Sequence, residues 1–294
     1  MSKPQTIIVA TDFSGNAQRA VERAAHLAQS WGAALALIHV FNDSAWSSLK
    51  AVYDLTRWSS VNPAETARAR LATLGEQIAK DFAVKVVAEV LIGRASEQIG
   101  HLAASRQAGL LVVGEHGENW LRDAVLGGTA LKVLEATQIP VLLVRRPAVA
   151  PYQRIIIATD FSGAATRAAR LTLELFPDAR HHLIHAYAVP FEARMRMGGA
   201  QEEDIRRYRD QASLEAMRNL EAFAVDCDYQ AAGEFSKLAL YGYPASVLFE
   251  QAQGMEADLI AIGKHGGGAV EELLLGSVTQ NIVYHAGCDV LLTP

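Results

Sequence analysis

Three glycines and a serine in the C-terminal half of the chain have a spacing that suits phosphate binding. Gly263 and Gly266 enclose two residues, and after nine more the chain reads Gly276-Ser277. Glycines can take positive φ angles that let backbone N–H groups close on a ligand, and a serine hydroxyl donates a further hydrogen bond. The pattern therefore predicts a cradle for phosphate, with positive φ angles at its glycines.

The segments on either side of the pattern support this prediction. The apolar run 258–262 is typical of a strand buried on both faces of a parallel sheet. From Ser277 onward, Val278, Ile282 and Val283 recur at helical spacing, and the N-terminus of a helix favours an anion. A simpler alternative is that the glycines only end a strand and begin a helix.

The N-terminal half carries the same pattern with one change. Gly114 and Gly117 enclose two residues, and after nine more the chain reads Gly127-Gly128. Gly128 stands where the other copy has a serine, so the hydroxyl is missing. We therefore expect an intact site in the C-terminal half and a degenerate one in the N-terminal half.

The repeat extends over the whole chain. Ala-Thr-Asp-Phe-Ser occurs at 10–14 and again at 158–162, and Asp12 and Asp160 are 148 residues apart. Gly114 and Gly263 are 149 residues apart, so insertions between the copies are small. This duplication predicts two domains, 1–147 and 151–294, joined by a short linker.

Each copy alternates buried-type strands with amphipathic helices. In the first copy the expected strands are 7–10, 34–40, 84–91, 110–113 and 141–144, and Ser14 is expected to cap the first helix. Such alternation requires parallel strands with right-handed crossovers. We predict an α/β fold of two tandem doubly wound sheets with strand order 3-2-1-4-5. Its ligand crevice would lie between strands one and four, where Asp160 and Gly263 stand.

Composition excludes several classes of protein. The net charge of −5, with 20% charged residues, provides no basic surface for nucleic acid or anionic lipid. Residues 1–6 lack the features of a signal peptide, no apolar run is long enough to span a membrane, and Cys227 and Cys288 have no CxxC spacing. We expect a cytoplasmic protein with free thiols and with neither a nucleic-acid nor a membrane partner.

Taken together, these sequence motifs resemble those of the universal stress protein family in its tandem two-domain form, and the resemblance covers essentially the whole chain. The resemblance implies that the crevice holds ATP, with Mg²⁺ as a possible bridge between phosphates. Carried over by motif, the C-terminal binding residues are Thr159, Asp160, Ala186, Ile262, Gly263, His265, Gly266, Gly276, Ser277, Val278 and Thr279. Their N-terminal counterparts are Thr11, Asp12, Val40, Val113, Gly114, His116, Gly117, Gly127, Gly128 and Thr129.

The expected function is stress-associated and regulatory, acting through nucleotide-dependent shape or association with a protein that the sequence does not identify. No nucleophile and base, and no Walker lysine, accompany the glycines, so hydrolysis of ATP should be slow at most. The resemblance also implies that the last strands of the domains pair, giving a pseudo-twofold monomer, with a homodimer as the alternative. A different class, a nucleotide-free interaction protein with crevices that bind another molecule or nothing, stays open.

Histidines and aspartates raise two further possibilities. His181, His182, His185 and His39 could suggest zinc, but alternation along a strand sends His182 and His185 to opposite faces, and we predict no metal site. The aspartates at the ends of the first strands could be phosphoacceptors, but no acidic pair precedes them. A carboxylate that contacts nucleotide or fixes the loop is the preferred interpretation.

Overall fold

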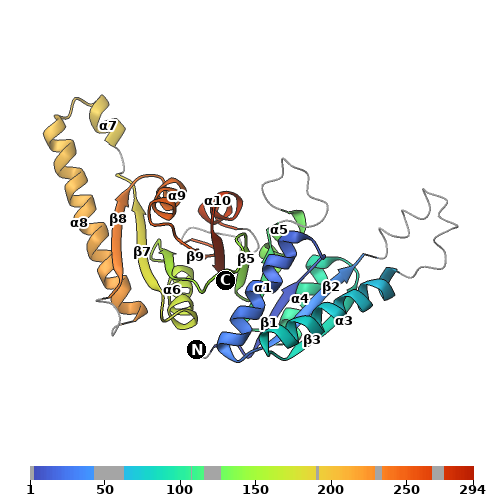
Figure 1. Cartoon of the computed structure of the whole chain (residues 1–294). Helices are drawn as coiled ribbons and strands as arrows, with labels where there is room; N and C mark the ends of the chain where they lie inside the picture. The colour runs from blue at the N-terminus through green and yellow to red at the C-terminus, as the bar shows by residue number, and fades with distance from the viewer. Residues whose placement is uncertain are drawn as a thin grey trace, which may run out of the picture. The chain divides into compact units, whose positions relative to one another are not determined.

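The computed structural model describes residues 3–42, 63–106, 108–115, 127–189, 192–228, 234–266 and 275–294 (Figure 1). The chain divides into two compact units, Ser2–Pro151 and Tyr152–Pro294. The division falls at the end of segment 146–151, where the first copy of the repeat gives way to the second.

In the N-terminal unit strands alternate with helices along the chain. The strands are β1 (Thr6–Ala10), β2 (Ala34–Phe41), β3 (Val86–Ile92), β4 (Leu110–Gly114) and β5 (Val141–Val144). The helices are α1 (Gly15–Trp31), α3 (Pro63–Phe82), α4 (Ala95–Ser105) and α5 (Gly128–Ala136). Ser14 caps α1 as predicted, and its hydroxyl oxygen accepts a hydrogen bond from the N–H of Ala17.

The C-terminal unit repeats this order, and its described residues include a short helix between the second and third strands. Its strands are β6 (Arg154–Ala158), β7 (Arg180–Tyr187), β8 (Ser236–Tyr241), β9 (Leu259–Gly263) and β10 (Asp289–Thr293). Its helices are α6 (Gly163–Leu175), α7 (Glu192–Met197), α8 (Glu202–Cys227), α9 (Pro244–Gly254) and α10 (Ser277–His285).

Both units contain the predicted doubly wound sheet. The strand order is β3-β2-β1-β4-β5 in one and β8-β7-β6-β9-β10 in the other, which is 3-2-1-4-5 in each. The described strand pairings within each unit are parallel, and even the register repeats, since Ile7 pairs with Leu110 and Ile155 with Leu259. The predicted fold class is confirmed, and in each unit the carboxyl ends of strands one and four are neighbours.

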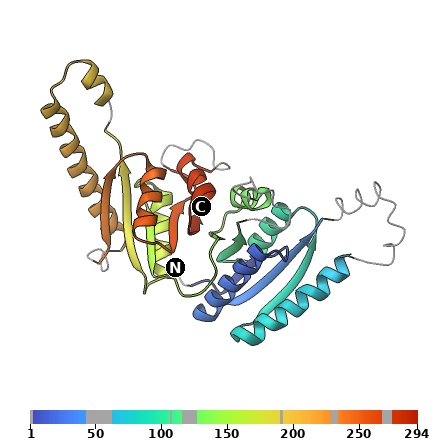
Figure 2. The same ribbon diagram turned by 45° about the horizontal axis from the view of Figure 1, so that its top comes forward.

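Helices cover both faces of each sheet (Figure 2). In the N-terminal unit α1 and α3 pack on one another and on the strands, while α4 packs with α5. In the C-terminal unit α6 and α8 form one such pair, and α9 and α10 the other. The central strands are fully buried, with Ile7, Ile8, Ile155 and Ile156 all at 0% exposure, as a sheet covered on both faces requires.

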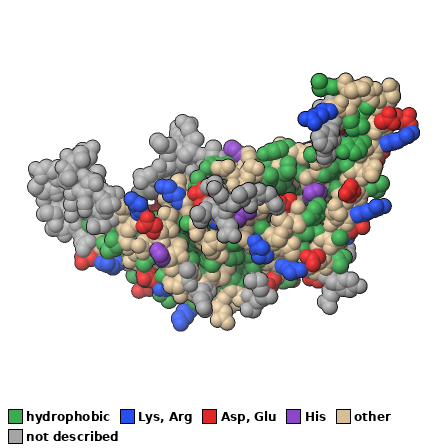
Figure 3. Space-filling view, turned by 180° about the vertical axis from the view of Figure 1, so that it is seen from behind, with side chains coloured by type: hydrophobic (Ala, Val, Ile, Leu, Met, Phe, Trp, Pro, Cys, Tyr) green, Lys and Arg blue, Asp and Glu red, His purple; other side chains and the backbone are tan. Residues whose placement is uncertain are grey.

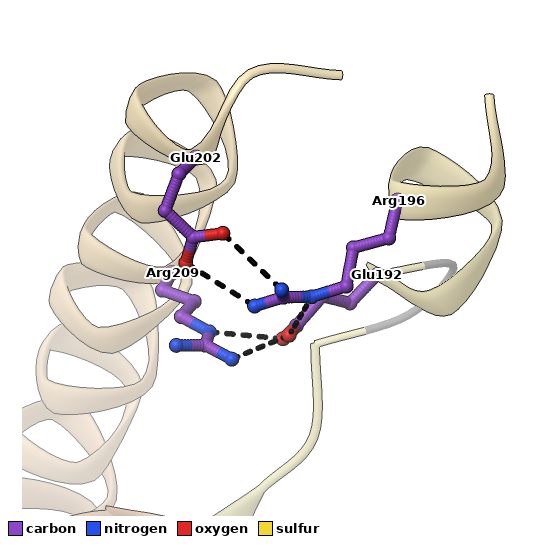
Figure 4. Close-up of polar contacts among 4 residues, drawn as sticks. All are labelled: Glu192, Arg196, Glu202 and Arg209. Atoms are coloured by element: carbon purple, nitrogen blue, oxygen red, sulfur yellow. Dashed lines mark hydrogen bonds and ion pairs between the residues drawn. The ribbon is translucent and has the colours of Figure 1, made fainter. Parts of the chain in front are cut away.

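The α7–α8 hairpin is specific to the C-terminal unit among the described residues (Figure 4). Glu192 on α7 accepts hydrogen bonds from Arg209 on α8, and Arg196 pairs with both Glu192, at 3.5 Å, and Glu202, at 3.2 Å. The hydrogen bond from Arg209 is the main cause that lowers the pKa of Glu192. Ile205, only 1% exposed, is the buried apolar residue of the first turn of α8. These contacts hold the described part of the excursion after β7 on α8.

Charged side chains of both signs are dispersed over one face of the molecule (Figure 3). On the face shown in Figure 3, Lys and Arg are interspersed with Asp and Glu and do not form one basic field. No helix in the described part of the chain is long and apolar enough to cross a membrane.

Candidate nucleotide-binding site

The turn that follows β6 is built from Thr159, Asp160, Phe161 and Ser162. The Thr159 hydroxyl oxygen accepts a hydrogen bond from the N–H of Phe161 at 3.0 Å, and Asp160 Oδ1 accepts one from the N–H of Ser162 at 3.0 Å. Ser162 Oγ then caps α6 by accepting from the N–H of Ala165 at 3.2 Å. Asp160 therefore uses Oδ1 to fix the turn while its side chain stays exposed.

Phe161 holds this turn in a conformation that L-residues rarely adopt. Its φ angle is +65°, a left-handed conformation that costs a residue with a Cβ about 1 kcal/mol. The Phe161 ring lies against the ring of His185 on β7, with centroids 4.2 Å apart, and 5.9 Å from the ring of Phe223 on α8. Side chains from two other elements thus fix the residue next to Asp160.

Gly263, at the end of β9, lies close to the start of α6. A Cβ at Gly263 would be 2.9 Å from both the carbonyl carbon and the Cβ of Ala164, closer than real Cβ atoms approach. The expectation of positive φ is wrong for all three motif glycines: neither Gly263 nor Gly266 has one, and φ at Gly276 is −58°. Gly263 is needed because the strand and the helix approach so closely.

Gly266 connects the glycine motif to Asp160. A Cβ at Gly266 would lie 2.6 Å from Asp160 Oδ2, so only a glycine leaves the carboxylate in its place. Gly276 continues the contact, because its N–H donates to the carbonyl of Lys264 at 3.0 Å and a Cβ added to it would lie 3.6 Å from the N atom of Gly266. The structure thus brings together the aspartate, the loop after β9 and the start of α10.

The first turn of α10 differs from that of α6 in how it is capped. Gly276 is the N-cap residue of α10 and provides no side-chain hydrogen bond, whereas Ser162 caps α6. Ser277 is exposed at the first helical position. An uncapped N-terminus with an exposed hydroxyl suits an anionic ligand.

Thr279 makes a hydrogen bond within the domain, and its predicted part in nucleotide binding stays a prediction. It is only 3% exposed, and its hydroxyl donates to the carbonyl of Gly263 at 2.8 Å. This hydrogen bond ties α10 to the end of β9 and commits the hydroxyl proton. The Thr279 side chain therefore shapes the loop.

The remaining predicted residues lie around this loop with different exposures. Ile262 is 7% exposed in β9, whereas Ala186 in β7, Val278 in α10 and His265 in the loop are partly exposed. His265 Nδ1 is buried and has no hydrogen-bond partner among the described residues.

The N-terminal unit contains the same turn. Thr11 Oγ1 and Asp12 Oδ1 each accept a backbone hydrogen bond at 3.0 Å, and Phe13 has φ +66°. A Cβ at Gly114 would lie 2.9 Å from the carbonyl oxygen of Asn16, and the N–H of Gly127 donates to the carbonyl of Glu115 at 3.0 Å. His116 and Gly117 lie outside the described residues.

The other N-terminal candidates occupy positions equivalent to those of the C-terminal set. Val113 is 5% exposed in β4 and Val40 is partly exposed in β2. Gly128 and Thr129 are exposed in the first turn of α5, whose N-cap residue Gly127 gives no side-chain hydrogen bond.

One difference between the copies was missed by the sequence interpretation. The residue after the first motif glycine is Lys264 in one copy and Glu115 in the other. Lys264 is 3% exposed, whereas Glu115 pairs with Arg145 at 3.1 Å. The sequence displays this change of charge, and the ion pair with Arg145 offsets the carboxylate in the N-terminal copy.

The described residues suit an anionic ligand better than a metal ion. The backbone at Gly266 is accessible only because the residue has no Cβ. Beside it lie the exposed carboxylate of Asp160 and the uncapped N-terminus of α10. No group of three or more His, Cys, Asp and Glu side chains in the described ranges could hold a metal ion.

Comparisons with known proteins identify the same family in both halves of the chain. The model of the universal stress protein family matches residues 4–145 and 151–294. A universal stress protein of Mycobacterium bovis is 25% identical over 99% of this chain and 96% of its own length. Another, from Methanocaldococcus jannaschii, is 30% identical over 48% of this chain and 81% of its own length. The crystal structure of a universal stress protein from Archaeoglobus fulgidus superimposes with a TM-score of 0.69 at 19% identity, covering 99% of this chain and 98% of that one.

Proposed function

Because the chain belongs to the universal stress protein family, with one family domain in each half, we propose that it binds ATP in its C-terminal domain. Binding would regulate the shape or the associations of the protein during stress. The proposal concerns recognition of a nucleotide and includes no chemical step.

One chain of contacts supports the proposal. Asp160 lies against Gly266, and a Cβ added to Gly276, the N-cap residue of α10, would lie 3.6 Å from the N atom of Gly266. An exposed carboxylate can accept hydrogen bonds from ribose hydroxyls, and the N–H groups at the start of α10 can donate to phosphate oxygens. A ligand that carries both a sugar and phosphates matches this order of groups.

The N-terminal domain is proposed as the weaker or empty one. Gly128 removes the hydroxyl that Ser277 offers, and this change disfavours phosphate. The turn around Asp12 is nevertheless built like its counterpart, so the difference would lie in the phosphate half of the site.

A second candidate function, nucleotide-independent binding of a protein partner, is favoured by the α7–α8 hairpin. Met197 at the end of α7 is 89% exposed and Leu214 on α8 is 62% exposed. Exposed apolar side chains mark a contact surface where they form a contiguous patch, so this candidate requires these two residues to belong to one. Binding there would require no ligand in the crevice.

The test begins with the protein as purified. Bound nucleotide is released by acid and separated by chromatography, and the thermal midpoint is then measured with ATP, ADP and GTP, each with and without Mg²⁺. We expect adenine nucleotide in the extract, or a midpoint that rises with ATP, because a ligand at a hundredfold excess over Kd stabilises by about 2.7 kcal/mol. An empty extract and an unchanged midpoint would reject the ATP proposal and favour the second candidate.

A further inference from the structure

Two histidines outside the predicted binding set hold the turns that carry the aspartates. Nδ1 of His185 lies 2.9 Å from the carbonyl oxygen of Thr159, and Nδ1 of His39 lies 2.8 Å from that of Thr11. We infer that His185 and His39 are positioning residues, which fix Asp160 and Asp12 through the backbone of the residue before each.

Each histidine extends the hydrogen bonding of the sheet beyond its last strand pair. The N–H of Thr159 donates to the carbonyl of Ile184, and the next residue, His185, returns a side-chain bond to the carbonyl of Thr159. The strand cannot continue here because the chain turns into α6. The imidazole replaces the backbone donor that a longer strand would have supplied.

The same ring also supports the strained residue after the aspartate. The ring centroids of His185 and Phe161 are 4.2 Å apart, and those of His39 and Phe13 are 4.7 Å apart. Each phenylalanine has a positive φ angle, so packing against the imidazole helps to hold a conformation that is otherwise unfavourable. The histidine thus contacts the turn on both sides of the aspartate.

The two copies have little else in common around these rings. Behind Phe161 lies the ring of Phe223, whereas behind Phe13 lies the guanidinium of Arg70 at 4.3 Å. The His-to-carbonyl bond and the ring contact are preserved although their surroundings differ. The shared feature is therefore the support of the turn and not a common packing environment.

The hydrogen bond also fixes the tautomer of each ring. A carbonyl oxygen only accepts, so Nδ1 must carry the proton, and in the neutral ring Nε2 is left as the acceptor. Asparagine can place an amide donor close to the position of Nδ1, whereas glutamine places its amide near Nε2. Comparing the two substitutions therefore shows whether the turn requires a donor at the position of Nδ1 or only a polar side chain.

The experiment compares His185→Asn with His185→Gln in the full-length protein. The wild-type tautomer is read from the ring ¹⁵N shifts above the pH range of histidine titration, and protection of the Phe161 amide from hydrogen exchange is measured in all three proteins. We expect Nδ1–H tautomers for both histidines, and exchange at Phe161 about fivefold faster in the Gln variant than in the Asn variant, as loss of one hydrogen bond predicts.

The consequence for binding rests on the proposed nucleotide site. ATP should bind His185→Asn within about twofold of wild type and His185→Gln about fivefold more weakly, while His39→Gln leaves the affinity unchanged. Nε2–H tautomers, or equal exchange at Phe161 in the two variants, would overturn the inference. If wild type binds no ATP, the proposed function fails, and the tautomer and exchange results still decide whether the histidines position the turns.

Discussion

Gly266 and Asp160 lie so close that a Cβ on the glycine would be 2.6 Å from Oδ2 of the aspartate. The two residues are far apart in the sequence, one in the loop after strand four of the domain and the other at the end of strand one. Both residues follow the carboxyl ends of neighbouring strands, where the doubly wound topology predicts a ligand crevice. A substitution at either residue should therefore move the other and weaken the binding of a ligand that contacts both.

Substituting Gly266 by alanine should displace the Asp160 carboxylate, because the added methyl group occupies its place. We expect ATP affinity to fall about tenfold, which corresponds to about 1.4 kcal/mol. Gly254→Ala is the matched control, since a Cβ there meets nothing within 4 Å and φ is ordinary. Equal affinities for the two variants in a fluorescence titration would show that the carboxylate does not contact the nucleotide.

The serine at the start of α10 can be exchanged with its counterpart. Ser277→Gly removes one exposed hydroxyl, and we expect ATP to bind about fivefold more weakly, as for loss of a single hydrogen bond. Gly128→Ser makes the reciprocal change where a Cβ meets nothing within 4 Å, so the variant should fold normally and keep the C-terminal affinity. An unchanged Kd for Ser277→Gly would remove this hydroxyl from the site.

Stability should fall below neutral pH because of a buried histidine. His181 is 8% exposed, its Nε2 has no hydrogen-bond partner, and burial lowers its pKa from 6.5. The unfolded chain therefore binds this proton at a higher pH than the native protein does. The contribution of His181 to the free energy of unfolding is therefore largest above pH 6.5. It decreases as the pH falls from 6.5 toward the lower pKa of the native protein.

Urea unfolding at several pH values between about 5 and 7.5 measures this dependence. His181→Asn cannot be protonated, so its free energy of unfolding should change less over this range than that of wild type. His182, whose pKa is also lowered by burial, contributes in the same direction and leaves a residual slope in the variant. Identical slopes in the two proteins would contradict the assignment to His181.

Sequence alone predicted the sheet order and the placement of Asp160 beside the glycine motif, because duplication and alternation of elements restrict the topology. It was wrong about the physical role of Gly263, which depends on how closely β9 approaches Ala164 of α6. The hydrophobic periodicity of a segment does not indicate how closely that segment approaches another. The support of the turn by His185 escaped prediction for the same reason, since a strand-end histidine acquires its partner only when the strands pair.

The central claim is that one domain of the two binds nucleotide, and calorimetric titration of ATP into the full-length protein tests it most directly. Asp160→Ala and Asp12→Ala form a matched pair, because each removes the same backbone hydrogen bond from the same kind of turn. We predict one ATP per chain, with binding lost in Asp160→Ala and retained in Asp12→Ala. Two sites per chain, loss of binding only in Asp12→Ala, or no heat with wild type would contradict the account.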